Sequence, residues 1–350
     1  MTHLFLYTEL AGYTLNCFKK HLILNPGDKI YVIHHPVNDE APFVFEKIQG
    51  VVFYEKRMLG LEGIYALYKE IKPDSVIISG WMDRDYMKVG RMIGKQCSVG
   101  LIIDNPWTGS IKQWLLLPLA RIILHSFVSW CWVPGKRQAL FASRLGFLET
   151  QIQLGFYATD IEPFVKMGLN RKEIKDRKKR FICVARYIPD KSYPLLWSAF
   201  QGIYAQIGED WELWCVGAGA DYENRAEHPG IRHLGFVQPA EMEYVIHQSD
   251  VFVLPSRYEP WGMVVQEFAA AGFPLILSTA VGASEAFMRH KENGFVFQSG
   301  SEEALKAALL NMTKISAEDR MRMSSKSREI AEIYIADMWS RALTDRAFVR

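Results

Sequence analysis

The chain has 350 residues, of which 49% are hydrophobic and 23% charged, and its formal net charge is +2. This length suits two domains of ordinary size, and the composition is typical of a globular protein in water. A net charge so close to zero excludes nucleic-acid binding that relies on a global positive field.

The cysteines and the first residues indicate the compartment. The five cysteines are scattered, odd in number and mostly inside apolar runs: Cys17, Cys97, Cys131, Cys183 and Cys215. This usage favours a reducing, cytoplasmic compartment. The apolar run at residues 3–8 is too short for a secretory signal, and we interpret it as a first strand.

Apolar runs of strand length alternate with segments of helix length through the first half of the chain. The expected strands are residues 3–8, 29–34, 51–54, 75–80, 99–104, 129–134 and 151–155. The expected helices are near residues 10–24, 60–72, 85–97, 110–127 and 136–146. This alternation is typical of parallel sheets wrapped by helices.

The most apolar stretch, residues 114–134, is the one place where a membrane span has to be considered. It is rich in Leu, Ile, Val, Phe and Trp, but Pro118, Arg121 and His125 interrupt it. We therefore expect a buried helix followed by a core strand. A surface helix that touches lipid is the alternative.

The second half repeats the pattern after a charged stretch, 166–180, which we interpret as a linker, with a basic binding patch as the alternative. The expected strands are residues 181–186, 211–217, 231–235, 250–255, 274–279 and 295–297. The expected helices are near residues 192–208, 239–248, 262–272, 283–290, 302–313 and 316–347. The prediction is an α/β protein with two doubly wound Rossmann-like domains, 1–165 and 181–332, facing a central cleft. Ligands of such sheets bind at the carboxyl ends of the strands.

Residues 255–272 hold the most informative local pattern. Proline and glycine break the strand 250–255, and a helix begins near Gly262, where free amides and the helix dipole suit a phosphate. Glu259 precedes this helix, and Glu267 lies inside it, roughly 7 to 8 Å along the axis from Gly262. We interpret the two carboxylates as contacts to opposite ends of one elongated ligand with a phosphate between. Capping or solvation is the simpler alternative.

Two cations and two glycines stand at neighbouring strand ends. Arg186 ends the strand 181–186 and Lys191 follows it, so the pair can neutralise a diphosphate. Gly217 and Gly219 follow the strand 211–217 and permit a close approach of backbone to a ligand.

Two further strand ends complete the pattern. Phe236 and Val237 follow the strand 231–235, where their backbone can meet a base edge, with packing of Phe236 as the alternative. The turn 281–285 follows a strand and opens a helix. Together these strand ends predict a pocket for a nucleoside diphosphate.

The ordered set resembles the nucleotide-sugar-dependent glycosyltransferases of the GT-B fold, specifically the retaining group of family 4. The matching pieces are 184–191, 216–219, 234–236 and 250–255, with Glu259 and Glu267 eight positions apart, and they cover most of 181–300. The resemblance implies that Arg186 and Lys191 hold the donor diphosphate, that Glu259 grips the transferred sugar and that Glu267 grips the ribose. The other donor-binding residues expected here are Gly217, Gly219, Phe236, Val237, Trp261, Gly262, Met263 and Val264.

The first domain matches the family less closely. Family members often carry a glycine-rich loop after the first strand, and residues 8–14 are a reduced form with one glycine, Gly12, as a donor-binding candidate. Many also place a histidine at a strand end facing the donor sugar, but 79–83 and 103–107 hold none. Asp104 or Asn105 is the substitute candidate for a catalytic role. Aromatic side chains that can stack on a sugar ring, with core packing as the alternative, are Trp81, Trp107 and Trp114.

The resemblance implies transfer of a sugar from a UDP- or GDP-linked donor to a hydroxyl acceptor with retained configuration. Arg186, Lys191 and the helix near Gly262 would stabilise the leaving diphosphate without a metal or another cofactor. It also implies a glycan or lipid-linked acceptor in bacterial surface polysaccharide or glycolipid assembly, a cytoplasmic location with peripheral contact to the inner face of the membrane, and a last helix, about 333–350, packed on the first domain. A sugar-nucleotide epimerase, a phosphorylase and a non-catalytic nucleotide-sugar binding protein are the alternatives.

Overall fold

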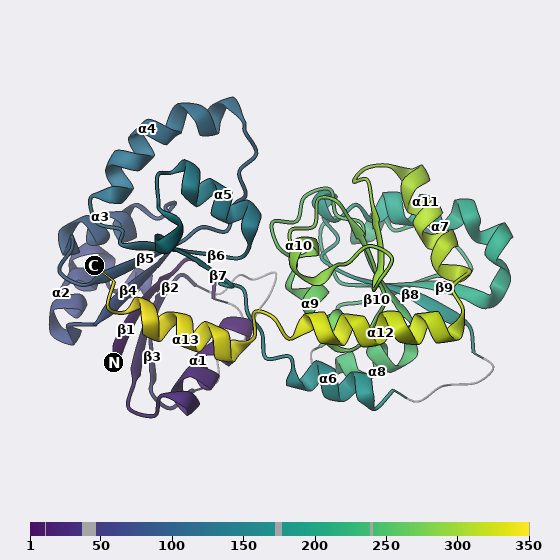
Figure 1. Ribbon diagram of the computed structural model, residues 1–350, viewed down its shortest axis with the longest axis horizontal. Helices are drawn as coiled ribbons and strands as arrows, with labels where there is room; N and C mark the ends of the chain where they lie inside the picture. Colours follow the sequence, from purple (N-terminus) through teal and green to yellow (C-terminus); the bar gives the residue numbers. More distant parts are fainter. Residues whose placement is uncertain (11, 37–46, 172–176, 239–240, 350) are drawn as a thin grey trace. The chain divides into compact units, whose positions relative to one another are not determined.

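The computed structural model describes residues 1–10, 12–36, 47–171, 177–238 and 241–349, and the chain forms two compact units (Figure 1). The first unit combines Met1–Asp160 with Tyr334–Arg350, and the second unit is Ile161–Ile333. Each unit contains one sheet with parallel strand pairing, and helices alternate with the strands along the chain. The predicted α/β class with two doubly wound domains is confirmed.

The sheet of the first unit has the strand order β3-β2-β1-β4-β5-β6-β7. Its strands are β1 (Thr2–Tyr7), β2 (Lys29–His34), β3 (Val51–Glu55), β4 (Ser75–Ser79), β5 (Ser98–Ile102), β6 (Trp130–Val133) and β7 (Ile152–Leu154). Its helices are α1 (Gly12–Leu24), α2 (Gly60–Ile71), α3 (Arg84–Ile93), α4 (Ile111–His125), α5 (Lys136–Arg144) and α13 (Ala336–Arg346). The order changes direction between β1 and β4, and such a switch point opens a crevice at the carboxyl ends of the strands.

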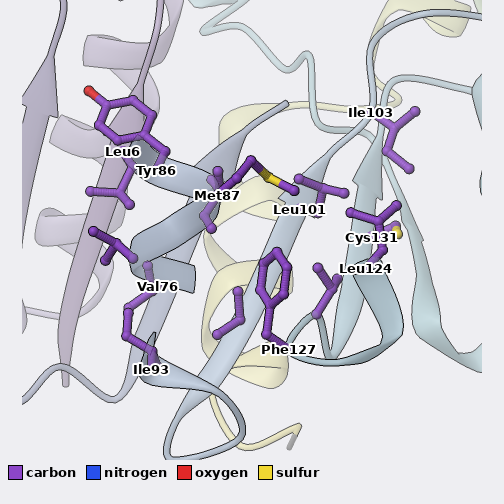
Figure 2. Close-up of a cluster of buried hydrophobic side chains, with 14 of the residues drawn as sticks. Leu6, Val76, Tyr86, Met87, Ile93, Leu101, Ile103, Leu124, Phe127 and Cys131 are labelled. Carbon is purple, nitrogen blue, oxygen red and sulfur yellow. The ribbon is translucent and has the colours of Figure 1, made fainter. Parts of the chain in front are cut away.

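The sheet of the first unit is buried on both faces, as expected for a parallel sheet. Along β1, Leu4 and Leu6 enter one hydrophobic core, whereas Phe5 and Tyr7 enter the other. Figure 2 shows the core that contains Leu6, where side chains of the strands meet those of α3 and the aromatic ring of Phe127. This packing fixes the strand ends that carry the candidate site.

The sheet of the second unit has the strand order β10-β9-β8-β11-β12-β13. Its strands are β8 (Lys179–Val184), β9 (Trp211–Val216), β10 (Ile231–Gly235), β11 (Val251–Leu254), β12 (Leu275–Ser278) and β13 (Gly294–Phe297). Its helices are α6 (Glu162–Leu169), α7 (Tyr193–Ile207), α8 (Met242–Gln248), α9 (Met263–Ala270), α10 (Ser284–Phe287), α11 (Glu302–Thr313) and α12 (Ala317–Ala331). Here the switch point lies between β8 and β11.

Three expectations differ from the structure. The single helix predicted over 316–347 is wrong, because the chain breaks between α12 and α13 at Tyr334, whose φ is +55°. The stretch 166–180, predicted as a linker, begins inside α6. Its residues 172–176 lie outside the described part of the chain. Residues 239–240, at the start of the predicted helix 239–248, also lie outside it. The buried helix predicted near residue 114 is instead α4, which is largely exposed, although the strand after it, β6, is fully buried.

Candidate functional site

The loops that follow four strands of the second unit are joined by backbone hydrogen bonds. The amide of Tyr187, after β8, donates to the carbonyl of Ala218, after β9, at 2.8 Å. The amide of Arg257, after β11, donates to the carbonyl of Asp190 at 2.9 Å. After β12, the amide of Gly282 donates to the carbonyl of Glu259, also at 2.9 Å. The strand ends singled out in the sequence therefore form one connected edge.

Gly217 and Gly219 are required by the close approach of two of these loops. Their φ values are +139° and +151°. A Cβ atom at Gly217 would lie 1.9 Å from the carbonyl oxygen of Ala185, and one at Gly219 would lie 2.5 Å from that of Tyr187. From the sequence, we selected these glycines only because they permit a close approach of backbone to a ligand. The structure shows that the packing of the two loops also requires them. Their contact with a donor stays a prediction.

We expect Gly217→Ala to destabilise the second unit by at least about 2 kcal/mol, since both the backbone conformation and the space are incompatible with a side chain. Urea unfolding measures this effect. The matched control is Gly202→Ala in α7, where the added Cβ meets only the flexible end of Lys306, so stability should hold or rise. Equal stabilities of the two variants would contradict this account of the loop.

Lys191 and Glu259 are brought together as an ion pair. Lys191 ends the short 3-10 turn Pro189–Lys191, and Glu259 lies in the loop after β11. Their side chains are only 14% and 12% exposed, so water screens the pair weakly. A diphosphate that binds Lys191 has to compete with this carboxylate. Arg186, at the same edge, is exposed.

The start of α9 lies next to this ion pair in sequence. Gly262, with a φ of +99°, turns the chain into the helix, and the amides of Met263 and Val264 fall in the first turn, where a helix supplies no acceptors. The side chain of Trp261 is only 2% exposed, with its ring 6.1 Å from that of Phe287. Trp261 therefore supports the turn from inside the unit, and its carbonyl accepts from the amide of Ala283 at 2.9 Å.

Glu267, inside α9, is a carboxyl group of this edge that lies in a desolvated environment. Its carboxyl has no hydrogen bond or ion pair within the described residues, although some of its surface remains accessible. Burial disfavours the charged form and raises the pKa of Glu267 from 4.5 to about 7. A carboxylate that is desolvated without a counter-charge is typical of a ligand contact awaiting its donors.

Phe236 and Val237 follow β10 at the outer end of the same sheet. The side chain of Phe236 is 59% exposed, whereas Val237 is half-buried. Packing of Phe236 in the core, the alternative reading of the sequence, is therefore wrong. An exposed aromatic ring at a strand end is available to stack on a planar base.

The first unit contains a pocket of about 350 Å³ at the carboxyl ends of β1, β4 and β5, beside its switch point. The pocket is lined by residues 7–9, 13, 79–82, 102–105, 156 and 157. It includes Asp104 and Asn105, and Trp81 is on its wall. Gly12 begins α1 next to this pocket in sequence but does not line it, while Trp107 packs edge to face on Trp114 at 5.2 Å.

Two tyrosines of this pocket were missed in the sequence. Tyr13 and Tyr157 line the pocket together with Asp104, and their rings pack edge to face at 5.6 Å. Burial raises the pKa of Asp104, although neighbouring backbone amides and the hydroxyl of Tyr157 act in the opposite direction. Tyr157 follows the predicted strand 151–155. The rule that ligands bind at the carboxyl ends of strands would have selected Tyr157 if we had applied it to this last strand of the first domain.

A second polar cluster lies at the ends of β2 and β4, and it contains an Asp-x-Asp sequence, Asp83 to Asp85, that the metal-free interpretation overlooked. Asp83 accepts from the amide of Tyr86 at 3.0 Å, contacts Nε2 of His35 at 2.7 Å and forms an ion pair with Lys56. Burial opposes ionisation of Asp83, but these donors outweigh it and lower its pKa. The carboxylate thus caps α3 and is already neutralised. His35 directly follows β2, so this strand end carries a histidine, whereas the two strand ends 79–83 and 103–107, where one was expected from the family, do not.

Within the residues that the structure describes, no helix is long and apolar enough to span a bilayer. All five cysteines lie within the described part of the chain, where they are buried and form no disulfide bond.

Comparisons with known proteins agree with this architecture. Residues 169–330 match the family described as glycosyl transferases group 1. An uncharacterized glycosyltransferase of Methanocaldococcus jannaschii is 33% identical over 126 residues, covering 35% of this chain and 32% of the relative. A GDP-mannose-dependent alpha-(1-6)-phosphatidylinositol monomannoside mannosyltransferase of Mycobacterium tuberculosis is 24% identical over 242 residues, covering 62% and 61%. The chain thus matches less than two thirds of the length of either relative.

Among solved structures, the Anabaena protein HepE in complex with UDP and glucose is similar over 99% of this chain and 98% of its own, with a TM-score of 0.72 and 16% identity. That likeness defines the class of fold as GT-B, with two parallel sheets and interleaved helices. The family match then confirms the resemblance to glycosyltransferases, carried by residues 169–330.

Proposed function

We propose that the chain is a retaining glycosyltransferase of the family 4 type, which moves a sugar from a nucleoside-diphosphate donor to a hydroxyl acceptor. The observation that carries the proposal is the connected edge of the second unit. There Lys191 and Glu259 lie in loops joined by backbone hydrogen bonds, and α9, which follows the loop of Glu259, supplies its first amides and the desolvated Glu267. The family match over 169–330 and the UDP found in HepE support the same donor class.

In this scheme each group of the edge has one task. Lys191, Arg186 and the amides of Met263 and Val264 stabilise the negative charge that develops on the leaving diphosphate, because donors aimed at developing charge lower the barrier. Glu259 then grips hydroxyls of the sugar.

The nucleoside end of the donor is held by other residues. Glu267 accepts hydrogen bonds from the ribose hydroxyls, which supply the donors that its carboxylate lacks. Phe236 and Val237 meet the base through an exposed ring and free backbone. The tight turns at Gly217 and Gly219 keep the diphosphate next to backbone amides.

For the acceptor we propose the pocket of the first unit. Its volume of about 350 Å³ is at the small end of ligand pockets and suits one sugar unit. Asp104 and Asn105 offer polar contacts for an acceptor hydroxyl, and Trp81 offers a ring face. We further propose a glycan or lipid-linked acceptor, a cytoplasmic location and contact with the membrane surface, as in surface polysaccharide or glycolipid assembly. No metal or other cofactor takes part in this scheme.

The test is a screen of UDP- and GDP-linked sugars. We expect one donor, at 100 times its Kd, to stabilise the protein by about 2.7 kcal/mol and to be consumed when a hydroxyl acceptor is added. Mass spectrometry identifies the product, and NMR shows whether its anomeric configuration is retained. Addition of EDTA should leave the rate within about twofold, because each invoked charge belongs to the protein.

Other results would overturn the proposal. An epimer formed from donor alone, or cleavage of a glycoside that depends on added phosphate, would assign the chain to a different enzyme class. Binding of a nucleotide sugar without turnover with any acceptor would indicate a binding protein. Loss of rate with EDTA, restored by magnesium, would contradict the metal-free scheme.

A further inference from the structure

The outer face of α4 exposes large apolar side chains to solvent. Their exposed fractions run from 50% for Leu116 to 78% for Ile111. The others on this helix are Trp114, Leu115, Leu119 and Ile122. Single exposed leucines are common on protein surfaces, but a helix that presents six such residues forms a contiguous patch, and such patches mark interaction sites.

The arrangement of these side chains around the helix is that of an interfacial helix. At about 100° per residue, Ile111, Leu115, Leu119 and Ile122 fall within an arc of roughly 80°, with Lys112 just beyond one border. Arg121 lies beyond the opposite border. The inward side of α4 carries Leu117 and Leu124, which are buried in the core, and Figure 2 shows Leu124 there.

The segment of sequence that contains α4 carries charge of one sign. Residues 105–148 contain five cations and no acidic residue, whereas the remainder of the chain has a net negative charge. These cations are Lys112, Arg121, Lys136, Arg137 and Arg144. The guanidinium of Arg144 lies 5.7 Å from the ring of Trp114, so one of them is placed directly against the apolar patch. A surface that is apolar in its centre and cationic at its border complements anionic lipid.

A second copy of the chain fits this face less well. In a two-fold pair the same patch meets itself, so the cations at its borders would face one another. Residues 105–148 offer no carboxylate to neutralise them.

We propose that the exposed face of α4 docks on the surface of a bilayer that contains anionic phospholipid, with the helix parallel to the membrane plane. The 15-residue helix offers a contact about 22 Å long. The apolar arc enters the region between headgroups and acyl chains, and the bordering cations contact lipid phosphates. The benefit of docking rests on the proposed function, since it brings a lipid-linked acceptor to the first unit, but the contact itself requires no transfer activity.

The experiment is cosedimentation of the full chain with vesicles of 30% phosphatidylglycerol in phosphatidylcholine, and with pure phosphatidylcholine. We expect binding to the anionic vesicles, weakened by salt, and at least tenfold weaker binding for Leu115→Ser combined with Ile122→Ser. Lys112→Glu should reduce the preference for anionic vesicles. The control is Ile23→Ser combined with Met58→Ser, which removes equally exposed apolar residues of the same unit and should bind like wild type.

The outcomes separate this proposal from the proposed function. Wild-type binding that is absent, or unchanged in the Leu115 and Ile122 variant, would overturn docking at α4. Dimers that dissociate in that variant during size-exclusion chromatography would assign the face to a second copy instead. Transfer to a water-soluble acceptor is measured in parallel. Its failure alongside intact vesicle binding would reject the proposed function and leave the docking surface standing.

Discussion

Glu267→Gln is expected to make the free protein more stable at pH 8 and to weaken donor binding at least about tenfold. The folded-state pKa of Glu267 is about 7, against an ordinary value of 4.5, because burial disfavours its charged form. The native state therefore binds more protons than the unfolded state between these pH values. The wild type loses stability as pH rises through this window, by up to about 3 kcal/mol, and the neutral variant does not.

Donor binding requires the charged form of Glu267, whereas the free protein is more stable with the neutral form. A hydroxyl group that donates to a carboxylate forms a charge-assisted bond worth roughly 1.5 to 3 kcal/mol, or about 10- to 150-fold in affinity. Because only ionised Glu267 accepts in this way, donor affinity of the wild type should rise as pH increases through about 7. Urea unfolding and donor titration from pH 5 to pH 8 measure both effects.

Glu292→Gln is the matched control, since Glu292 is an exposed glutamate of the same unit. It should change neither stability nor donor affinity. A Glu267→Gln variant that binds the donor like wild type would remove Glu267 from the donor site. A variant less stable than wild type at pH 8 would show that the carboxylate has a compensating partner.

A second large effect is expected on acidification of the first unit. His3 and His21 are fully buried around Asp28, and their Nδ1 atoms share hydrogen bonds with Ser75 at 2.8 Å and Ser340 at 2.9 Å. Burial, together with the nearby His21, lowers the pKa of His3 from 6.5 to about 4, although Asp28 acts in the opposite direction.

The sign of this effect follows from proton binding. Between pH 6.5 and pH 4 the unfolded chain binds a proton at His3 that the native state excludes. The stability of the first unit is therefore fully present above pH 6.5 and falls by roughly 3 kcal/mol as pH decreases to about 4. Glu267 changes the second unit in the opposite sense, so the comparison has to be made between variants.

The measurement is unfolding of wild type and His3→Asn from pH 7 to pH 4. Asparagine places a polar atom near the position of Nδ1 but does not titrate, so the variant should lose less stability on acidification. His290→Asn removes an exposed histidine whose Nδ1 accepts a hydrogen bond from the amide of Val296, and the pH profile of this variant should follow wild type. Parallel profiles for wild type and His3→Asn would show that His3 is not the acid-sensitive group.

The strands were the most predictable part of this fold. Two of them, Lys29–His34 and Ile231–Gly235, have the predicted bounds, because a Pro-Gly pair closely precedes each strand. The break at Tyr334 was not predictable, because neither glycine nor proline marks it. It depends on tertiary contact, since a Cβ at Gly155 would lie 2.7 Å from the Tyr334 ring. The helix α6 was hidden for a similar reason, as Gly168 packs directly on the backbone of Ala271.

In the candidate site, too, some features could be predicted from the sequence and others depend on tertiary contacts. The rule that ligands bind at strand carboxyl ends was enough to select Lys191 and Glu259. Their pairing was beyond sequence reasoning, because 68 positions separate the two residues and only the folded loops bring them together. The raised pKa of Glu267 was likewise invisible, since it depends on which neighbours exclude water. Asp83 shows the reverse case, a motif visible in the sequence whose carboxylate is already engaged in the structure.

The first unit is built from two segments that are far apart in the sequence. This determines the order in which the two units can complete their folding during synthesis. Trp339 of α13 is 2% exposed and stacks on Trp132 at 4.9 Å and on Phe5 at 6.0 Å. The segment Met1–Asp160 therefore lacks an aromatic part of its own core until α13 has left the ribosome. The second unit is one continuous segment and is complete once Ile333 has emerged. The domain translated second is thus the first able to finish folding, and the earlier domain leaves apolar surface accessible to chaperones until α13 has emerged.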